Sequence, residues 1–316
     1  MRYVLSGNLT KQMVEYLTKM PRFEPLDVLV SQLDRSSIKE MIEHRKNGIV
    51  KTLFIDSGAF SVHTGKAKVD IDEYIEYVNS IDEYIEMVAQ VDTIPGTFGK
   101  AKSAEDYAES SRKSWENFLY MYHKMKSPEK LVPVFHFGEP FSTLKNMLDW
   151  RDESGRPLTY VGISPANDTS QNIKNQYMNE VFEFIANSAN PDVKAHLFGM
   201  TSLDALSKYP AFSADSVSHR LQAAYNKIFT PEFGTISLSK KSRASKTKSN
   251  MSFVDLADET ALNKLKDYLA SLNVTLEECQ ENHNARSAVC IRGILDWVKT
   301  HPYSPKNRTK TRKFLV

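Results

Sequence analysis

Short apolar runs and amphipathic stretches alternate along most of the chain. The runs are rich in β-branched residues, as buried strands are, and the stretches between them repeat apolar residues at helical spacing. Eight such runs occur, at residues 27–32, 52–58, 87–92, 131–138, 159–164, 194–200, 211–217 and 234–239. Eight strands with a helical stretch in each gap predict a (β/α)8 TIM barrel. A doubly wound sheet is the alternative, but no Gly-rich phosphate-binding sequence follows the first predicted strand.

The same pattern predicts how the chain is divided. We expect the barrel to occupy residues 1–240. Residues 241–316 are expected to form a basic loop and a C-terminal helical extension that packs on the barrel. Within this extension, CIRGILDWV (290–298) has amphipathic helical spacing, which suits a helix that covers the flank of the barrel.

The carboxyl ends of the predicted strands carry polar and small side chains, and in a barrel these ends share the face on which barrel enzymes hold their catalytic groups. The residues are Asp56, Ser57, Asp92, His136, Gly162, Gly199 and Asp215. Aspartate is a poor strand former and is costly to bury unpaired, so three aspartates at strand ends favour a shared polar pocket. For each aspartate taken singly, a local turn remains the alternative, because Asp side chains accept hydrogen bonds from nearby backbone.

Composition bounds the class of protein. The chain has 316 residues, of which 41% are hydrophobic and 25% are charged, so it can bury one large core or two modest ones. No run approaches the roughly 18 apolar residues of a membrane span, and MRYVLSGNLTKQ lacks the apolar core of a signal peptide. We therefore expect a cytoplasmic protein without a membrane partner.

Cysteine content limits the metal chemistry that the chain can support. The two cysteines, Cys279 and Cys290, cannot build a disulfide framework, which fits a reducing compartment. Together with His283 they suggest a zinc site, but their spacing fits no standard zinc pattern and a fourth ligand is not evident. We expect no cofactor.

Positive charge is concentrated in two segments. The formal net charge is only +2, yet KKSRASKTK (240–248) and KNRTKTRK (306–313) carry five basic residues each, which leaves 31 Lys and Arg against 39 Asp and Glu elsewhere. Basic, Ser/Thr-rich segments on an acidic body are typical of arms that contact nucleic-acid phosphates, whereas a solvated loop and a frayed tail are the alternative. The predicted phosphate-contacting residues of the first segment are Lys240, Lys241, Arg243, Lys246 and Lys248.

Five short motifs resemble those of the tRNA-guanine transglycosylase superfamily. FIDSGAFS (54–61) is similar to the family's TDSGGFQ motif, and VFHFG (134–138) stands where the family has a Val-Gln-Gly-Gly turn. YVGIS (160–164) resembles the Ala-Val-Gly strand, HLFGM (196–200) the Leu-Met-Gly segment, and SADSVSHR (213–220) the Phe-Asp-Cys-Val strand with its following Arg. The motifs keep the family's order over about half of the chain.

The resemblance implies base exchange by a pentosyltransferase that replaces guanine with a 7-deazaguanine such as preQ0 or preQ1. It implies Asp215 as the nucleophile that forms a covalent intermediate, and Asp56 as the group that handles protons. Asp92 would accept hydrogen bonds from guanine, while His136 replaces a glutamine that donates to O6. A neutral imidazole can also supply one N–H.

The remaining implied roles concern the shape of the base site and the polymer. The Gly162 backbone N–H would be a second donor to O6, and Ser57 and Gly199 would leave room for a flat base. Arg220 corresponds to the Arg that follows the family's nucleophile strand and would contact nucleic acid. The aromatic residues near the mouth that are candidates to stack on the base are Phe60, Phe98 and Phe137, with plain core packing as the alternative for each.

One departure from the family affects the choice of substrate. The family's zinc motif needs three closely spaced cysteines and a distant His, and this chain has two cysteines in total. The chain therefore resembles most the phage and bacterial relatives that insert 7-deazaguanines into DNA. Such an enzyme must flip the guanine out of the duplex or act on opened strands. The same reaction on tRNA, and a barrel that binds nucleic acid without catalysis, remain alternatives.

Overall fold

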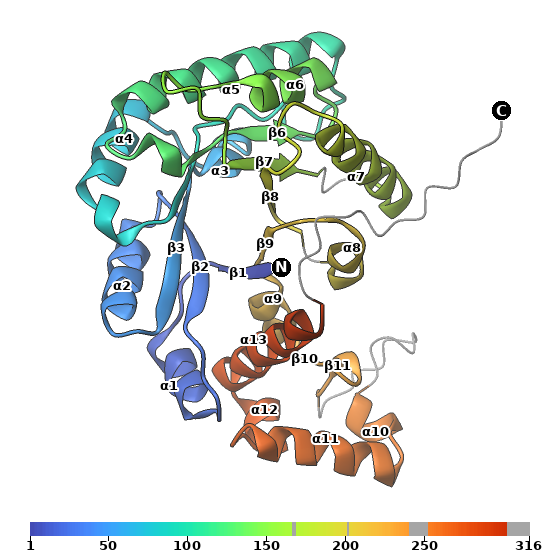
Figure 1. The fold of residues 1–316 in the computed structure, drawn as a ribbon. Helices are drawn as coiled ribbons and strands as arrows, with labels where there is room; N and C mark the ends of the chain where they lie inside the picture. The colour runs from blue at the N-terminus through green and yellow to red at the C-terminus, as the bar shows by residue number, and fades with distance from the viewer. Residues whose placement is uncertain (166–168, 201, 240–251, 302–316) are drawn as a thin grey trace, which may run out of the picture. The chain divides into compact units, whose positions relative to one another are not determined.

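The fold is α/β, with a nine-stranded sheet that nearly closes into a barrel and helices interleaved between the strands (Figure 1). The computed structural model describes residues 1–165, 169–200, 202–239 and 252–301. The strands of the sheet are β1 (Arg2–Ser6), β2 (Leu26–Ser31), β3 (Val50–Asp56), β4 (Met87–Ala89), β5 (Leu131–Val132), β6 (Val134–His136), β7 (Tyr160–Ser164), β8 (Lys194–Leu197) and β9 (Ser213–Ser216).

The strand order explains how the sheet nearly closes. It runs β5-β4-β3-β2-β1-β9-β8-β7-β6, and the pairs β1–β2, β3–β4, β4–β5, β6–β7, β7–β8 and β8–β9 are parallel. The two strands at the ends of this order, β5 and β6, are separated in the chain by Pro133 alone. The carbonyl of Pro133 accepts a hydrogen bond of 2.8 Å from the Gly162 amide, so the residue that joins β5 to β6 contacts β7.

The helices that alternate with these strands begin where the local sequence favours it. They are α2 (Arg35–Lys46), α3 (Ala59–His63), α4 (Ile71–Ser80), α5 (Ala104–Lys124), α6 (Phe141–Asp149), α7 (Gln171–Ala186) and α8 (Leu203–Lys208). Asp34 and Asp70 cap α2 and α4 through side-chain oxygens, and Ser103 forms a capping box with Asp106 at the start of α5. Each cap satisfies backbone N–H groups that the first helical turn leaves unpaired.

The predicted parallel strands are confirmed except for the last one. The run at 234–239 forms β11 (Gly234–Ser237), which pairs antiparallel with β10 (Lys227–Thr230) in a separate two-stranded sheet. The sheet instead gains β1 at the N-terminus, a strand that the sequence pattern missed. Hydrophobic periodicity cannot tell a parallel partner from an antiparallel one, and β1 presents only three buried residues in a row.

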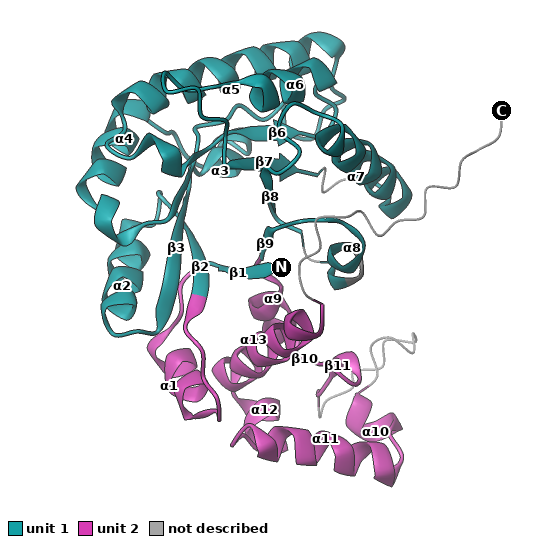
Figure 2. Cartoon of the chain, viewed as in Figure 1, with its two compact units in different colours: residues 1–7, 27–215, 303–316 teal, residues 8–26, 216–302 magenta. Residues whose placement is uncertain are grey.

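The chain separates into two compact units (Figure 2). The described part of the first unit comprises residues 1–7, 27–165, 169–200 and 202–215, and it contains most of the nine-stranded sheet. The described part of the second comprises residues 8–26, 216–239 and 252–301. Besides the β10–β11 hairpin, the second unit contains α1 (Lys11–Lys19), α9 (Ser218–Ala224), α10 (Phe253–Leu256), α11 (Glu259–Ser271), α12 (Leu276–Glu281) and α13 (His283–Thr300).

Helix α13 is the centre of the second unit. It packs against α1, α9 and β10, and it confirms the helix expected from the pattern at 290–298. Gly293 permits the contact with β10, because a Cβ atom at this position would lie 2.4 Å from the carbonyl oxygen of Phe229. Among the helices that the structure describes, none combines the length and apolar character that a membrane crossing requires.

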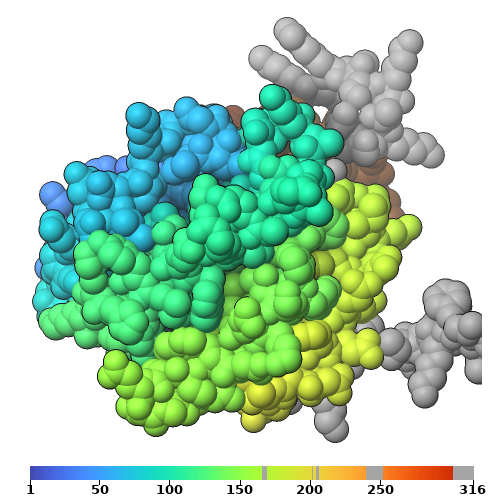
Figure 3. Space-filling view, turned by 90° about the horizontal axis from the view of Figure 1, so that it is seen from above, coloured from blue at the N-terminus to red at the C-terminus, as the bar shows by residue number. Residues whose placement is uncertain are grey.

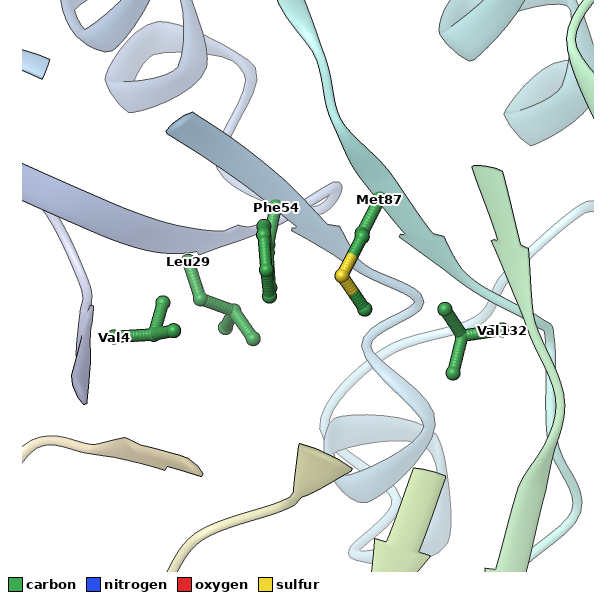
Figure 4. Close-up of a cluster of buried hydrophobic side chains, with 5 residues drawn as sticks. All are labelled: Val4, Leu29, Phe54, Met87 and Val132. Atoms are coloured by element: carbon green, nitrogen blue, oxygen red, sulfur yellow. The ribbon is translucent and has the colours of Figure 1, made fainter. Parts of the chain in front are cut away.

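One buried hydrophobic cluster links five neighbouring strands of the first unit (Figure 4). Val4, Leu29, Phe54, Met87 and Val132 come from β1 to β5 in order and pack against one another. Tyr160 and Phe198 are partly buried against the same cluster. Since each strand contributes one side chain, the cluster holds these strands of the sheet together and sets the positions of their carboxyl ends.

We expect Phe54→Ala to lower the free energy of unfolding by about 3–5 kcal/mol, because it removes a ring that is 2% exposed and leaves a cavity between the strands. Urea denaturation followed by far-UV circular dichroism measures this change. Phe98→Ala is the matched control, since Phe98 is 58% exposed and its loss should change stability by about 0.5 kcal/mol or less. Equal effects of the two substitutions would contradict the role given to the cluster.

Candidate active site

Asp56 ends β3 and begins a tight turn. Its Oδ2 accepts a hydrogen bond of 3.0 Å from the Gly58 amide, which is the local turn contact that the sequence allows. Gly58 adopts a left-handed conformation (φ 81°), and a Cβ atom there would lie 2.6 Å from Cδ1 of Leu33. Glycine is therefore required at this position, and the turn directs the Asp56 carboxyl toward two other carboxylates.

Asp92, beyond the end of β4, is the first of these carboxylates. Its Oδ1 accepts a hydrogen bond of 3.0 Å from the Ser57 hydroxyl, and its Oδ2 lies 2.8 Å from Nε2 of His136 at the end of β6. The other ring nitrogen of His136, Nδ1, lies 3.1 Å from Oε1 of Glu139. A serine, two carboxylates and an imidazole thus form one buried row.

Glu139 fixes the far end of this row. Its Oε2 accepts from the His136 backbone amide at 3.0 Å, and its Oε1 accepts from the Ser110 hydroxyl of α5 at 2.9 Å. Burial alone would lower the pKa of His136, but the hydrogen bonds and charges of Asp92 and Glu139 outweigh it and raise the pKa to about 10. At neutral pH the ring is therefore an imidazolium that donates to a carboxylate on each side.

Asp215, in β9, is the second carboxylate near Asp56. Its Oδ2 accepts a short hydrogen bond from the Ser6 hydroxyl at the end of β1, and its Oδ1 accepts one of 2.9 Å from the Gly199 amide. Oδ1 also lies 3.3 Å from Nε2 of His196, a fully buried residue of β8. The other ring nitrogen of His196 lies 2.8 Å from the Ser213 hydroxyl. These contacts hold the carboxylate in one orientation.

The gathering of buried carboxylates has its largest effect on the pKa of Asp56. Burial disfavours its charged form, and the negative charges of Asp92 and Asp215 disfavour it further, so the pKa of Asp56 is raised to about 7. The Gly58 amide opposes this shift only in part. Asp56 can therefore exist as either acid or base near neutral pH, while donors surround Asp215. Two carboxylates at one site thus have different chemical settings, as general acids and nucleophiles require.

The structure brings most of the sequence-predicted residues of this face together, but Gly162 is an exception. Its amide donates to Pro133 within the sheet, and a Cβ atom on it would lie 2.5 Å from the Phe198 ring. It therefore cannot offer its N–H to a ligand as expected. The His136 N–H groups are likewise used within the protein, because both ring nitrogens face carboxylates.

The predicted nucleic-acid contacts lie elsewhere in the chain. Arg220 belongs to α9 of the second unit, where its guanidinium donates to the Asn8 side chain at 3.2 Å. Lys240, Lys241, Arg243, Lys246 and Lys248 lie outside the described residues. Of the aromatic candidates, Phe137 packs against Tyr177, whereas Phe98 is 58% exposed.

The cysteines of the second unit have no metal-binding geometry in the described part of the chain. Cys279 and Cys290 are buried as free thiols, and burial raises the pKa of each to about 12. Burial also lowers the pKa of His283. Within residues 1–165, 169–200, 202–239 and 252–301, no group of three or more His, Cys, Asp and Glu side chains is arranged to hold a metal ion.

Ser6, Ser110 and His196 take part in the site although the sequence did not mark them. Ser6 ends β1, so its role could be seen only once that strand was recognised. His196 lies inside a predicted strand, where the sequence alone does not distinguish its side chain from a core residue.

In comparisons with known proteins, no family model matches the sequence and no curated protein matches it.

We expect Asp56→Asn to stabilise the protein relative to wild type as the pH rises from about 4 to about 7. In this window the folded state keeps a proton on Asp56 that the unfolded chain, with its ordinary pKa of 3.8, has released. The wild-type free energy of unfolding therefore falls with increasing pH, and the loss is complete above about pH 7. The variant lacks this titration. Urea denaturation of both proteins across the range measures the difference, and a difference that does not change with pH would contradict the raised pKa.

Proposed function

We propose that the protein is a guanine transglycosylase that exchanges guanine in DNA for a 7-deazaguanine base such as preQ0 or preQ1. The observation that carries the proposal is the meeting of Asp56, Asp92 and Asp215, from three different strand ends, in distinct chemical settings. A base exchange that retains configuration at the sugar needs a fixed nucleophile, a group that transfers protons and an acceptor for the base. Each aspartate has surroundings suited to one of these tasks.

Asp215 is the proposed nucleophile. Its carboxylate attacks C1′ of the target nucleotide, the C1′–N9 bond breaks, and the bonding electrons leave with guanine. The Ser6 hydroxyl and the Gly199 amide hold the carboxylate in place, which suits an attack that must occur in line with the departing base. The covalent intermediate preserves the energy of the glycosidic linkage until a second base arrives.

Asp56 is the proposed proton carrier. In its acid form it protonates the departing guanine, and as a carboxylate it takes the proton that the incoming base releases when its N9 bonds to C1′. In this second step the Asp215–C1′ bond breaks, so no oxidant or reductant is needed. A pKa of about 7 makes both forms of Asp56 accessible at neutral pH, which is the condition for efficient transfer in both directions.

Asp92 is the proposed acceptor for the N1–H and exocyclic amine of guanine. Its oxygens already accept from Ser57 and His136, but each carboxylate oxygen has a second lone pair. The His136 imidazolium, anchored on its other side by Glu139, holds the Asp92 carboxyl in one orientation. The N1–H and amine of guanine need an acceptor, and the oxygens of Asp92 supply it.

We further propose that the nearly closed sheet is a (β/α)8 barrel. Treating β5 and β6 as one strand interrupted at Pro133 leaves eight parallel strands, in the order expected for that fold. DNA is favoured over tRNA because the sequence lacks the three closely spaced cysteines of the family's zinc motif. The site would act on a guanine extruded from the duplex or in an opened strand.

Incubation with radiolabelled guanine tests the activity and the polymer together. We expect label to enter duplex or single-stranded DNA and not tRNA, with release of unlabelled guanine, because exchange with guanine itself needs no other substrate. Incorporation into tRNA alone would replace the DNA proposal with the tRNA alternative. No incorporation into either polymer, with DNA binding intact, would favour a non-catalytic nucleic-acid-binding protein.

Asp215→Ala should lower the rate of guanine exchange by about 10⁴-fold or more, because no covalent intermediate can form without the carboxylate. The protein should remain folded, which circular dichroism checks. Asp192→Ala is the control, since Asp192 is exposed in the loop before β8, and it should exchange guanine at the wild-type rate. Activity of Asp215→Ala within about tenfold of wild type would remove Asp215 from the nucleophile role.

Asp92→Asn should weaken the binding of free 7-deazaguanine by about 10–100-fold. The amide places a donor against the donors of the base, and an unmet hydrogen bond of this kind costs about 1–3 kcal/mol. Isothermal titration calorimetry measures the affinity, and a urea unfolding curve shows whether the folded state persists. Binding as tight as that of wild type would place Asp92 outside the base site.

A further inference from the structure

Two loops of the first unit carry the same four-residue sequence. Gly65-Lys66-Ala67-Lys68 follows α3, and Gly99-Lys100-Ala101-Lys102 precedes α5. The first loop belongs to the connection after β3 and the second to the connection after β4, which are the strands that lead to Asp56 and Asp92. The repeat therefore lies on the two connections that leave the candidate active site.

The loops share a backbone conformation as well as a sequence. Gly65 and Gly99 both adopt left-handed conformations, with φ of 71° and 76°, and nothing lies within 4 Å of the position that a Cβ atom would occupy on either. Each loop therefore turns sharply at an open glycine and then presents two lysines separated by one alanine. Lys66, Lys68 and Lys100 are exposed, and Lys102 is half-buried.

Contacts between aromatic side chains bring the two connections side by side. The ring of Phe98, next to the second loop, meets those of Phe60 and His63 edge-on, with centroid distances of 6.4 Å and 5.9 Å. Phe60 and Phe98 are each 58% exposed. Burial, and then the positive charges of Lys102 and His136, lower the pKa of His63, so the lysine of one loop lies near the aromatic residue of the other. Figure 3 shows blue and turquoise parts of the chain next to each other on one face of the molecule.

The four lysines have no acidic partners within the described residues. Lys46, Lys124 and Lys130 on neighbouring elements form ion pairs with nearby carboxylates, whereas Lys39 and Lys51, like the loop lysines, have no acidic partner within the described residues. The acids that follow the loops are used in helix capping. Asp70 accepts from backbone amides at the start of α4, and Asp106 accepts from the Ser103 amide at the start of α5.

We propose that the two GKAK loops form a phosphate-binding surface for a single-stranded stretch of nucleic acid beside the reacting nucleotide, with Phe98 stacking on one of its bases. The choice of DNA as the polymer rests on the proposed function. Lysines carried on open glycine turns can follow a flexible backbone, and an exposed aromatic ring accepts any base. A base that reacts either is extruded from the duplex or lies in an opened strand, and in an opened strand the nucleotides next to it are unpaired.

The aromatic ring separates nucleic acid from other polyanions. A nucleic acid carries a planar base beside every phosphate, whereas an anionic lipid headgroup offers the lysines a phosphate without a planar partner for Phe98. The location supports the same choice, since both loops continue from the strand ends that carry the carboxylates. A polymer held by the loops therefore passes the candidate active site.

Binding of fluorescein-labelled oligonucleotides, measured by anisotropy at several salt concentrations, tests the surface without any base exchange. The variants are K66Q/K68Q, K100Q/K102Q and Phe98→Ala. Each lysine pair should weaken binding to single-stranded DNA of every sequence and make the slope of log affinity against log salt shallower by about 1.4, because two phosphates are no longer neutralised. Phe98→Ala should weaken binding by about tenfold with an unchanged slope, because stacking releases no counterions.

A matched control separates the loops from net charge. K39Q/K51Q removes the same charge from exposed lysines on α2 and at the amino end of β3, and it should leave the slope as in wild type. An equal decrease in slope for this control, or no decrease for either loop variant, would overturn the proposal. Tighter binding to vesicles containing phosphatidylserine than to the oligonucleotide, through the same lysines, would overturn the assignment to nucleic acid.

The outcome is also independent of the enzymatic proposal. If the loop variants lose salt dependence but the protein exchanges no guanine, the surface stands and the transglycosylase function fails. If guanine exchange is observed and the loop variants bind and react as wild type does, the function stands and the surface fails. Inorganic polyphosphate as a competitor completes the test, because Phe98→Ala should not change its affinity, and a parallel loss would overturn the stacking role.

Discussion

Repulsion between carboxylates gathered at one end of the sheet is the constraint on which the rest of the site depends. Asp56, Asp92, Glu139 and Asp215 lie at or beyond the carboxyl ends of β3, β4, β6 and β9, where burial makes unpaired negative charge costly. The structure meets this cost in three ways. Asp56 keeps a proton to higher pH, the His136 imidazolium is shared between Asp92 and Glu139, and Asp215 is surrounded by hydrogen-bond donors. The three aspartates therefore differ in their surroundings: one keeps its proton, one faces an imidazolium, and one accepts hydrogen bonds from neighbouring donors.

These solutions depend on the topology of the sheet. Ser6 reaches Asp215 because β1 pairs between β2 and β9, and the β6–β7 pairing places His136 within the ring of strand ends. The hydrophobic cluster around Phe54 fixes the strands on one side, and Pro133 carries the chain from β5 to β6 so that the sheet nearly closes. A flat sheet with the same residues would spread the carboxylates along an edge, where water would screen them and no pKa would shift strongly.

The sequence predicts the architecture well wherever one local rule suffices. Runs of β-branched residues locate the parallel strands, and an aspartate at the end of such a run marks Asp56 and Asp215, because a strand interior does not tolerate that charge. The run at 234–239 is misassigned because a strand of an antiparallel hairpin has the same hydrophobic periodicity as a strand of the parallel sheet. Gly162 and His136 show a second limit. Whether an N–H faces a ligand or a neighbouring strand depends on pairing partners far away in the chain, which local patterns do not contain.

The same electrostatics bear on how a polyanion could approach this face. A cluster of carboxylates repels phosphate, so a nucleic acid would reach it only if positive charge lies close by and is not already neutralised. The imidazolium of His136 is buried between its two carboxylates and contributes little at a distance. Lys66 and Lys100, by contrast, are exposed on the connections after β3 and β4 and meet no acidic side chain in the described part of the chain. The exposed lysines on the two connections suit the phosphate backbone of a nucleic acid outside the site. The carboxylates of the candidate active site suit a neutral base inside it.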